Sequence, residues 1–131
     1  MFDTVALSES RKKAPNPGFM RWITGIEVDA IHTSVLCLGE IRRGVEKLPV
    51  GDRRTAFERW LEIELPAFLG QRVLTIDDTV AQAWGRMSAH RTLALPDALI
   101  GATALVYGLT VVTRNVRDFD GLGVSVVNPW T

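Results

Sequence analysis

The stretch of residues 93–106, LALPDALIGATALV, most constrains the fold because it predicts a helix with hardly any polar face. Pro96 suits the first helical turn, where its missing N–H costs no hydrogen bond, and the carboxylate of Asp97 is favoured by the helix dipole. A single threonine is the only polar side chain after Asp97, so we expect this helix to be buried. Gly108 predicts its end, and the apolar run 109–113 predicts a buried strand directly after it.

The rest of the chain alternates short apolar segments with helical patterns. Strands are predicted at 1–2, 30–33, 73–76, 109–113 and 124–127. Helices are predicted from Pro17 to near Gly25 after the cap Asn16, over 34–47, over 52–65 with Pro66 ending it, and after a cap at Asp77 or Asp78. Apolar strands separated by helices are typical of a parallel sheet covered on both faces. We therefore expect one α/β domain over residues 1–131.

Composition and charge set limits on where this protein acts and what it binds. Of its 131 residues, 47% are hydrophobic and 23% charged, as in a globular domain. Fifteen basic and fifteen acidic residues cancel, so any nucleic-acid binding must rest on local clusters such as Arg11–Lys13, Arg42–Arg43, or Arg114 with Arg117. Each cluster is equally explained as solvated surface. Without a long apolar run or a signal segment, a cytoplasmic protein that contacts no membrane is expected, and Cys37 is expected in the core.

Four acidic residues stand at defined places in the predicted elements. Asp3 ends the first strand, Glu40 lies on the helix after the second, Asp97 opens the central helix, and Asp118 follows the fourth strand. Because strand ends and the loops after them meet at one edge of a parallel sheet, these carboxylates are expected to gather there. Clustered carboxylates need a cation to stay ionised, and Mg²⁺ is a hard ion that carboxylates bind. Water activated by such an ion is a natural nucleophile for phosphodiester hydrolysis.

Four sequence segments in the same order resemble the PIN-domain ribonucleases of the VapC toxin type, most of all the FitB-like branch. The segments are DTVALSE, SVLCLGEIRRGV, LPDALIGATAL, and VVTRNVRDF followed by GVSVVNPW. They span nearly the whole chain. The resemblance implies a three-layer α/β/α fold with a parallel five-stranded sheet, an endoribonuclease activity, a homodimer and an antitoxin partner.

The resemblance also implies roles for individual residues. The metal-binding and catalytic acids would be Asp3, Glu40, Asp97 and Asp118, with Mg²⁺ or Mn²⁺ as the cofactor. Nearby polar support and contacts to the RNA backbone are expected from five further residues: Thr4, Thr113 and Asn115 for support, and Arg114 and Arg117 for RNA.

Two departures from the family pattern lie beside Asp3. Asparagine is usual where this chain has Val5, and three or four apolar residues usually precede the first aspartate, where this chain has two. They leave open an alternative, a degenerate PIN domain that binds an antitoxin but cleaves little. A phosphoacceptor receiver domain would need a lysine after the last strand, and a haloacid-dehalogenase-type phosphatase would need an aspartate at position 5; both are excluded. His32 and His90 lack zinc-like spacing, so structural or solvated roles are expected for them.

Apolar side chains exceed what a chain of this length is expected to bury. Phe19, Trp22, Phe57, Trp60 and Leu61 therefore predict a self-association surface.

Overall fold

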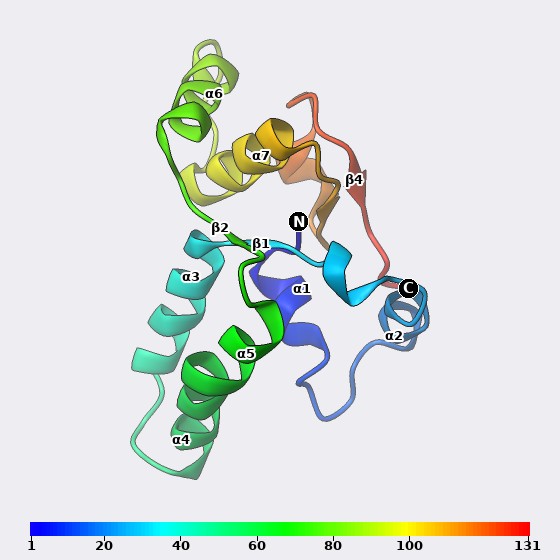
Figure 1. Ribbon diagram of the computed structural model, residues 1–131, viewed down its shortest axis with the longest axis vertical. Helices are drawn as coiled ribbons and strands as arrows, with labels where there is room; N and C mark the ends of the chain where they lie inside the picture. The colour runs from blue at the N-terminus through cyan, green and yellow to red at the C-terminus, as the bar shows by residue number, and fades with distance from the viewer.

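The computed structural model describes residues 1–131 and places parallel strands between two groups of helices (Figure 1). Helices α6 and α7 lie above β1 and β2 in this view, and α1, α3, α4 and α5 lie below them. The helical elements are α1 (Thr4–Glu9), α2 (Pro17–Ile23), η1 (Val28–Ala30), α3 (Val35–Glu46), α4 (Asp52–Arg59), η2 (Trp60–Glu64), α5 (Leu65–Leu69), α6 (Asp78–Ser88), α7 (Leu95–Tyr107) and η3 (Val116–Phe119). None of them is both long and apolar enough to span a bilayer.

Parallel pairing brings distant parts of the chain side by side. Strand β1 (Thr33–Ser34) pairs with β2 (Val73–Leu74), and β3 (Val111–Val112) pairs with β4 (Val126–Val127). Phe2 lies between the two pairs and makes isolated parallel bridges to Thr33 and Val112. The structure therefore has two two-stranded parallel sheets with the bridging residue Phe2 between them, and the predicted five-stranded sheet is not confirmed.

Every strand is shorter than predicted, and the strands expected at 30–33, 109–113 and 124–127 all begin later than predicted. The N–H groups of Ala30 and Ile31 donate to the carbonyls of Glu27 and Val28, at 2.9 and 3.0 Å. These bonds hold residues 28–30 in the 3₁₀ turn η1, so the strand expected at 30–33 begins at Thr33. Local turn hydrogen bonds have replaced ladder bonds at this position.

The prediction that Pro66 ends a helix is wrong. Helical structure continues from α4 through the π-helical turn η2 into α5, with Pro66 in the first turn of α5. The N–H of Leu65 donates to the carbonyl of Trp60, five residues back, as in a π-helix. Because proline has no N–H and crowds the preceding turn, the wider π turn lets the helix pass it.

Helix α7 occupies the centre of the fold as its apolar sequence predicts. Its buried residues are Ala98, Ile100, Gly101, Ala102, Thr103 and Ala104. A Cβ on Gly101 would lie 3.3 Å from Leu122, which shows how closely the segment after β3 packs on this helix. Gly108 ends α7 with φ +65°, a left-handed conformation that favours glycine.

Several aromatic residues that predicted self-association lie in the core instead. Phe19 is fully buried and packs on Phe2, Trp22 and Trp130, with ring centroids 6.4, 5.9 and 4.9 Å away. Trp60 and Leu61 are 8% exposed. These buried side chains fill the space between helices, so they are not available for self-association. Cys37 is buried as predicted.

Candidate active site

Asp3 is held at the carboxyl end of the bridging segment by local hydrogen bonds. It is 9% exposed, and its Oδ1 accepts the N–H of Ala6 at 2.8 Å, which makes it the N-cap of α1. Burial raises the pKa of Asp3, and the charge of Glu40 raises it further, against hydrogen bonding from Thr113 and from the start of α1. The charged form of Asp3 is therefore destabilised by burial and by a second carboxylate nearby.

Glu40 reaches the same place from α3. Its Oε1 accepts the hydroxyl of Thr4 at 2.7 Å, so the residue after Asp3 orients the glutamate. One helical turn after Glu40, the surface of α3 at Gly44 is not covered: a Cβ added to this glycine would have no neighbour within 4 Å. A hollow of about 260 Å³ opens there, and both Thr4 and Glu40 line it.

Asp97 lies in the first turn of α7, and its side chain makes no capping hydrogen bond. The N-cap of that helix is Ala94, so capping does not explain the acid. Burial is the main cause that raises the pKa of Asp97, followed by the charges of Asp118, Glu40 and Asp3. Four segments far apart in the sequence thus place their carboxylates within electrostatic reach of one another.

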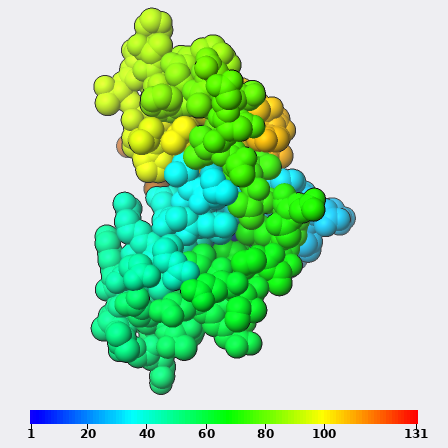
Figure 2. Space-filling view, turned by 60° about the vertical axis from the view of Figure 1, so that its left-hand side comes forward, coloured from blue at the N-terminus to red at the C-terminus, as the bar shows by residue number.

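Asp118 is the acid whose charge acts most strongly on Asp97. It is exposed on η3, which follows β3 after three residues. Figure 2 shows the molecule narrowing between the start of α7 and α3, the helices that carry Asp97 and Glu40. The charges of the other three acids thus act on Asp97, whereas the expectation that all four form one site stays a prediction.

Comparison with known proteins identifies the family. Residues 1–123 match the PIN domain. The chain belongs to the PIN-domain family. It is 31% identical to Toxin FitB of Neisseria gonorrhoeae, over 99% of this chain and 97% of that protein. It is 30% identical to VapC ribonuclease Y4jK of Sinorhizobium fredii, over 99% and 96%. The crystal structure of FitAcB from Neisseria gonorrhoeae superposes with a TM-score of 0.92 at 28% identity, over 98% and 96%.

The acids of this PIN domain fit a divalent cation by their chemistry. No three acidic, histidine or cysteine side chains stand as a ready metal-binding group. Four carboxylates nevertheless supply the hard oxygen ligands that suit Mg²⁺ and Mn²⁺. A cation among them would offset the repulsion that raises the pKa of Asp97. Asp3, Glu40, Asp97 and Asp118 are the residues that would hold it.

Four of the five predicted supporting and substrate-binding residues lie on the segment after β3, and the fifth, Thr4, begins α1. Thr113 is fully buried, and its Oγ1 accepts the N–H of Asn115 at 3.0 Å. Arg114 and Arg117 are exposed and line a shallow hollow of about 430 Å³ together with Asn115 and Asp118. This PIN domain therefore has two guanidinium groups without an ion pair, those of Arg114 and Arg117, beside Asp118.

Sequence reasoning missed Ser8 and Arg53. Both line the hollow beside Glu40. Ser8 lies on α1, a helix that was not predicted, and Arg53 is one of several arginines on a predicted surface helix. Neither residue has a local sequence signal, because only the packing of α4 beside α1 and α3 brings Arg53 to the acids.

Proposed function

We propose that this PIN domain is a divalent-metal-dependent endoribonuclease and the toxin of a type II toxin–antitoxin module in the cytoplasm. One observation carries the proposal: the pKa of Asp97 is raised by burial and, beyond that, by the charges of three acids from three other parts of the chain. Buried repulsion of this kind costs stability, and active sites are where proteins retain it. The names of the relatives, a VapC ribonuclease and a toxin, support the same activity.

Each residue has a distinct part in the proposed reaction. Asp3 and Asp97, with Glu40 and Asp118, would hold the cation through their negative charge. A bound divalent ion would supply activation of a water and stabilisation of the charge that develops on the phosphate. Thr113 and Thr4 orient Asp3 and Glu40 through hydrogen bonding. Arg114 and Arg117 steady the scissile strand by contacts to its phosphates.

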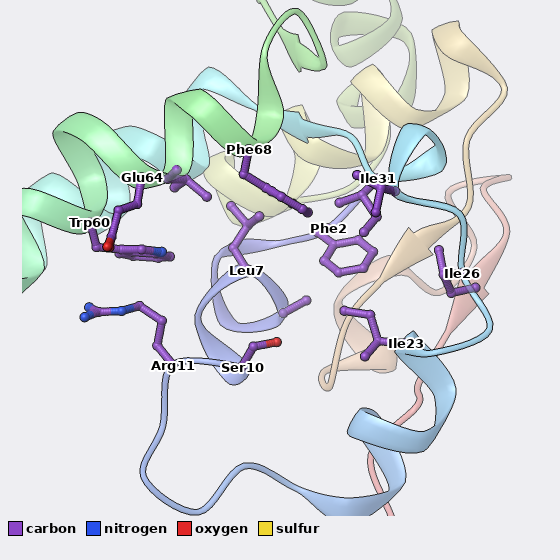
Figure 3. A pocket seen from close by; sticks show the side chains of 13 residues that line it. Phe2, Leu7, Ser10, Arg11, Ile23, Ile26, Ile31, Trp60, Glu64 and Phe68 are labelled. Carbon is purple, nitrogen blue, oxygen red and sulfur yellow. The ribbon is translucent and has the colours of Figure 1, made fainter.

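An antitoxin partner is part of the proposal, and an apolar groove supports it. A cavity of about 430 Å³ lies between α1, α2, η1 and α5, and ten of its thirteen lining residues are hydrophobic. Figure 3 shows Phe2, Leu7, Ile23, Ile31 and Phe68 converging on it. Exposed apolar grooves of this size are typical docking sites for a partner segment.

A homodimer also belongs to the proposal. Leu105 and Tyr107, near the end of α7, are each 45% exposed, as is Phe68 on α5. Exposed apolar side chains are the surface that self-association would cover. Light scattering at high micromolar concentration should give twice the chain mass, and a monomer there would contradict this part of the proposal.

The decisive experiment is cleavage of a structured RNA by the purified protein with Mg²⁺ or Mn²⁺. We expect slow cleavage that chelator abolishes and that Asp97→Ala reduces at least about 100-fold, the scale of losing a charged group of an active site. Asp78→Ala is the matched control, because Asp78 occupies the first turn of α6 as Asp97 occupies that of α7. Equal loss in both variants would contradict the assignment.

The second candidate, a degenerate domain that only binds its partner, is favoured by Val5. This side chain is 39% exposed on the turn that follows Asp3 and offers neither donor nor acceptor to the carboxylates. Lost polar contacts around a metal site lower affinity or activity by about 10 to 100-fold. Val5→Asn should therefore raise cleavage by up to that factor. If Val5→Asn stays as inert as Asp97→Ala while both remain folded, the binding module is the better description.

A further inference from the structure

A basic groove adjoins the acidic site. The hollow beside Glu40 shares Ser8, Arg53 and Phe57 with a larger one of about 760 Å³. Four of the seven residues that line the larger hollow are basic and none is acidic: Arg11, Lys12, Lys13 and Arg53 among Ser8, Ala56 and Phe57. We call these seven residues the basic groove. Its three shared residues, Ser8, Arg53 and Phe57, border the hollow that Glu40 lines.

Most of the positive charge in the basic groove is unpaired. Lys12 forms an ion pair with Glu9 at 2.8 Å, whereas Arg11, Lys13 and Arg53 form none. The chain as a whole is neutral, so this concentration of cations is a local excess. Local positive charge of this kind attracts a polyanion even when the net charge does not.

Aromatic rings lie among the cations. The guanidinium of Arg11 lies 4.5 Å from the ring centroid of Phe57 and 4.9 Å from that of Trp60, and Arg53 lies 5.9 Å from Phe57. Figure 3 shows Arg11 stacked beneath Trp60. Nη1 of Arg11 is buried without a hydrogen-bond partner. Single-stranded nucleic acid is bound by this combination, in which cations contact phosphates and planar groups stack on bases.

We propose that the basic groove is the path along which the single-stranded RNA backbone runs to the acids. In this path Lys13 and Arg53 contact phosphates, and Arg11, packed on Phe57 and Trp60, adds positive charge to the wall of the groove. The inference rests on the proposed nuclease function and extends it by naming where the substrate lies away from the cleaved bond. A protein partner is expected in the apolar groove on the other side of Arg11, where hydrophobic side chains dominate.

Binding can be measured apart from cleavage. The probe is a fluorescein-labelled 12-nucleotide uridine RNA, and the protein carries Asp97→Ala in chelator so that no RNA is cut. Lys13→Ala and Arg53→Ala change exposed side chains that make no ion pair, so folding is preserved. Arg11 is left in place because it packs against two rings. Arg86→Ala on α6, exposed and unpaired, is the matched control.

Each groove substitution should weaken binding by roughly threefold to tenfold at low salt. The slope of log affinity against log salt concentration should become shallower by about 0.7 for each lost phosphate contact. Lys13→Glu with Arg53→Glu should weaken it further, and Arg86→Ala should have no effect. In the chain with Asp97 intact, the same groove variants should slow cleavage by raising KM. Polyglutamate should compete far more weakly than polyuridine.

Three outcomes would overturn the inference. Unchanged RNA affinity in the groove variants, with wild-type cleavage present, would remove the groove from the substrate path and leave the nuclease function standing. Displacement of RNA by polyglutamate as readily as by polyuridine would assign the groove to an acidic protein segment. A wild-type protein that neither binds nor cleaves RNA would remove the inference and the proposed function together.

Discussion

At the scale of single residues, Asp3 combines a structural role with a destabilising charge. Its Oδ1 caps α1, while burial and Glu40 raise the pKa of its carboxyl group. Asparagine caps a helix as well as aspartate does but carries no charge. In the metal-free protein, Asp3→Asn should therefore increase the free energy of unfolding by roughly 0.5–2 kcal/mol and abolish cleavage. Urea unfolding at pH 7 with chelator measures the first effect and the RNA assay the second.

Asp77→Asn is the control for this prediction. Asp77 caps α6 through its Oδ1, which accepts the N–H of Val80 at 3.0 Å, but it is exposed and away from the other acids. The same substitution there should change stability by only a few tenths of a kcal/mol. A loss of stability in Asp3→Asn would mean that the buried charge at this site is compensated.

At the scale of elements, Glu9 joins α1 to α2 and to the end of the chain. It is 2% exposed, and its carboxylate receives Lys12 at 2.8 Å and the N–H of Asn16 at 3.2 Å. Burial by itself raises the pKa of Glu9, but hydrogen bonds from Lys12 and Asn16, and the nearby Trp130 indole, hold it below its ordinary value. The charged form is thus favoured by folding, although the group is buried.

The pKa shift of Glu9 predicts a pH-dependent stability. Because the folded-state pKa is depressed, the stabilisation is present above the unfolded value of about 4.3 and is lost as the pH falls through the folded-state pKa. Glu9→Gln should cost about 1.5–3 kcal/mol at pH 7, the range for hydrogen bonds to a charged group, and the difference from wild type should shrink below pH 4. Urea unfolding from pH 7 to pH 3 measures both.

Glu62→Gln is the comparison for Glu9. Glu62 also contacts a cation, Arg42, at 2.7 Å, but its side chain is 52% exposed. A surface pair of this kind contributes about 0–1 kcal/mol. Similar costs at the two positions would mean that burial of the Glu9 carboxylate adds nothing.

At the scale of the whole molecule, four segments are held together against the repulsion of their carboxylates. A cation that binds them only when they are together stabilises the folded chain by mass action. Millimolar Mn²⁺ should therefore raise the melting temperature by about 2–5 °C, and chelator should reverse it. Differential scanning fluorimetry on wild type and Asp97→Ala measures this, and equal shifts in both would place the ion elsewhere.

The sequence by itself determined several helix starts and the end of the central helix. Asn16, Ser34 and Asp77 cap helices where their side chains predicted helix starts, and Gly108 ends α7. These features depend on hydrogen bonds and backbone preferences within a few residues, so the printed order of residues is enough to find them. The positions of Asp3, Asp97 and Asp118 near element ends were visible for the same reason.

Only the tertiary structure decided which side chains meet. The π turn that carries the helix past Pro66, the burial of Phe19, and the approach of Arg53 to Glu40 all depend on packing between segments far apart in the chain. Apolar periodicity shows that a side chain is buried but not against what, because hydrophobic attraction has no direction and no partner specificity. The shared edge of the acids could be inferred from parallel topology, whereas their mutual effect on pKa, and the basic groove beside them, exist only in the folded chain.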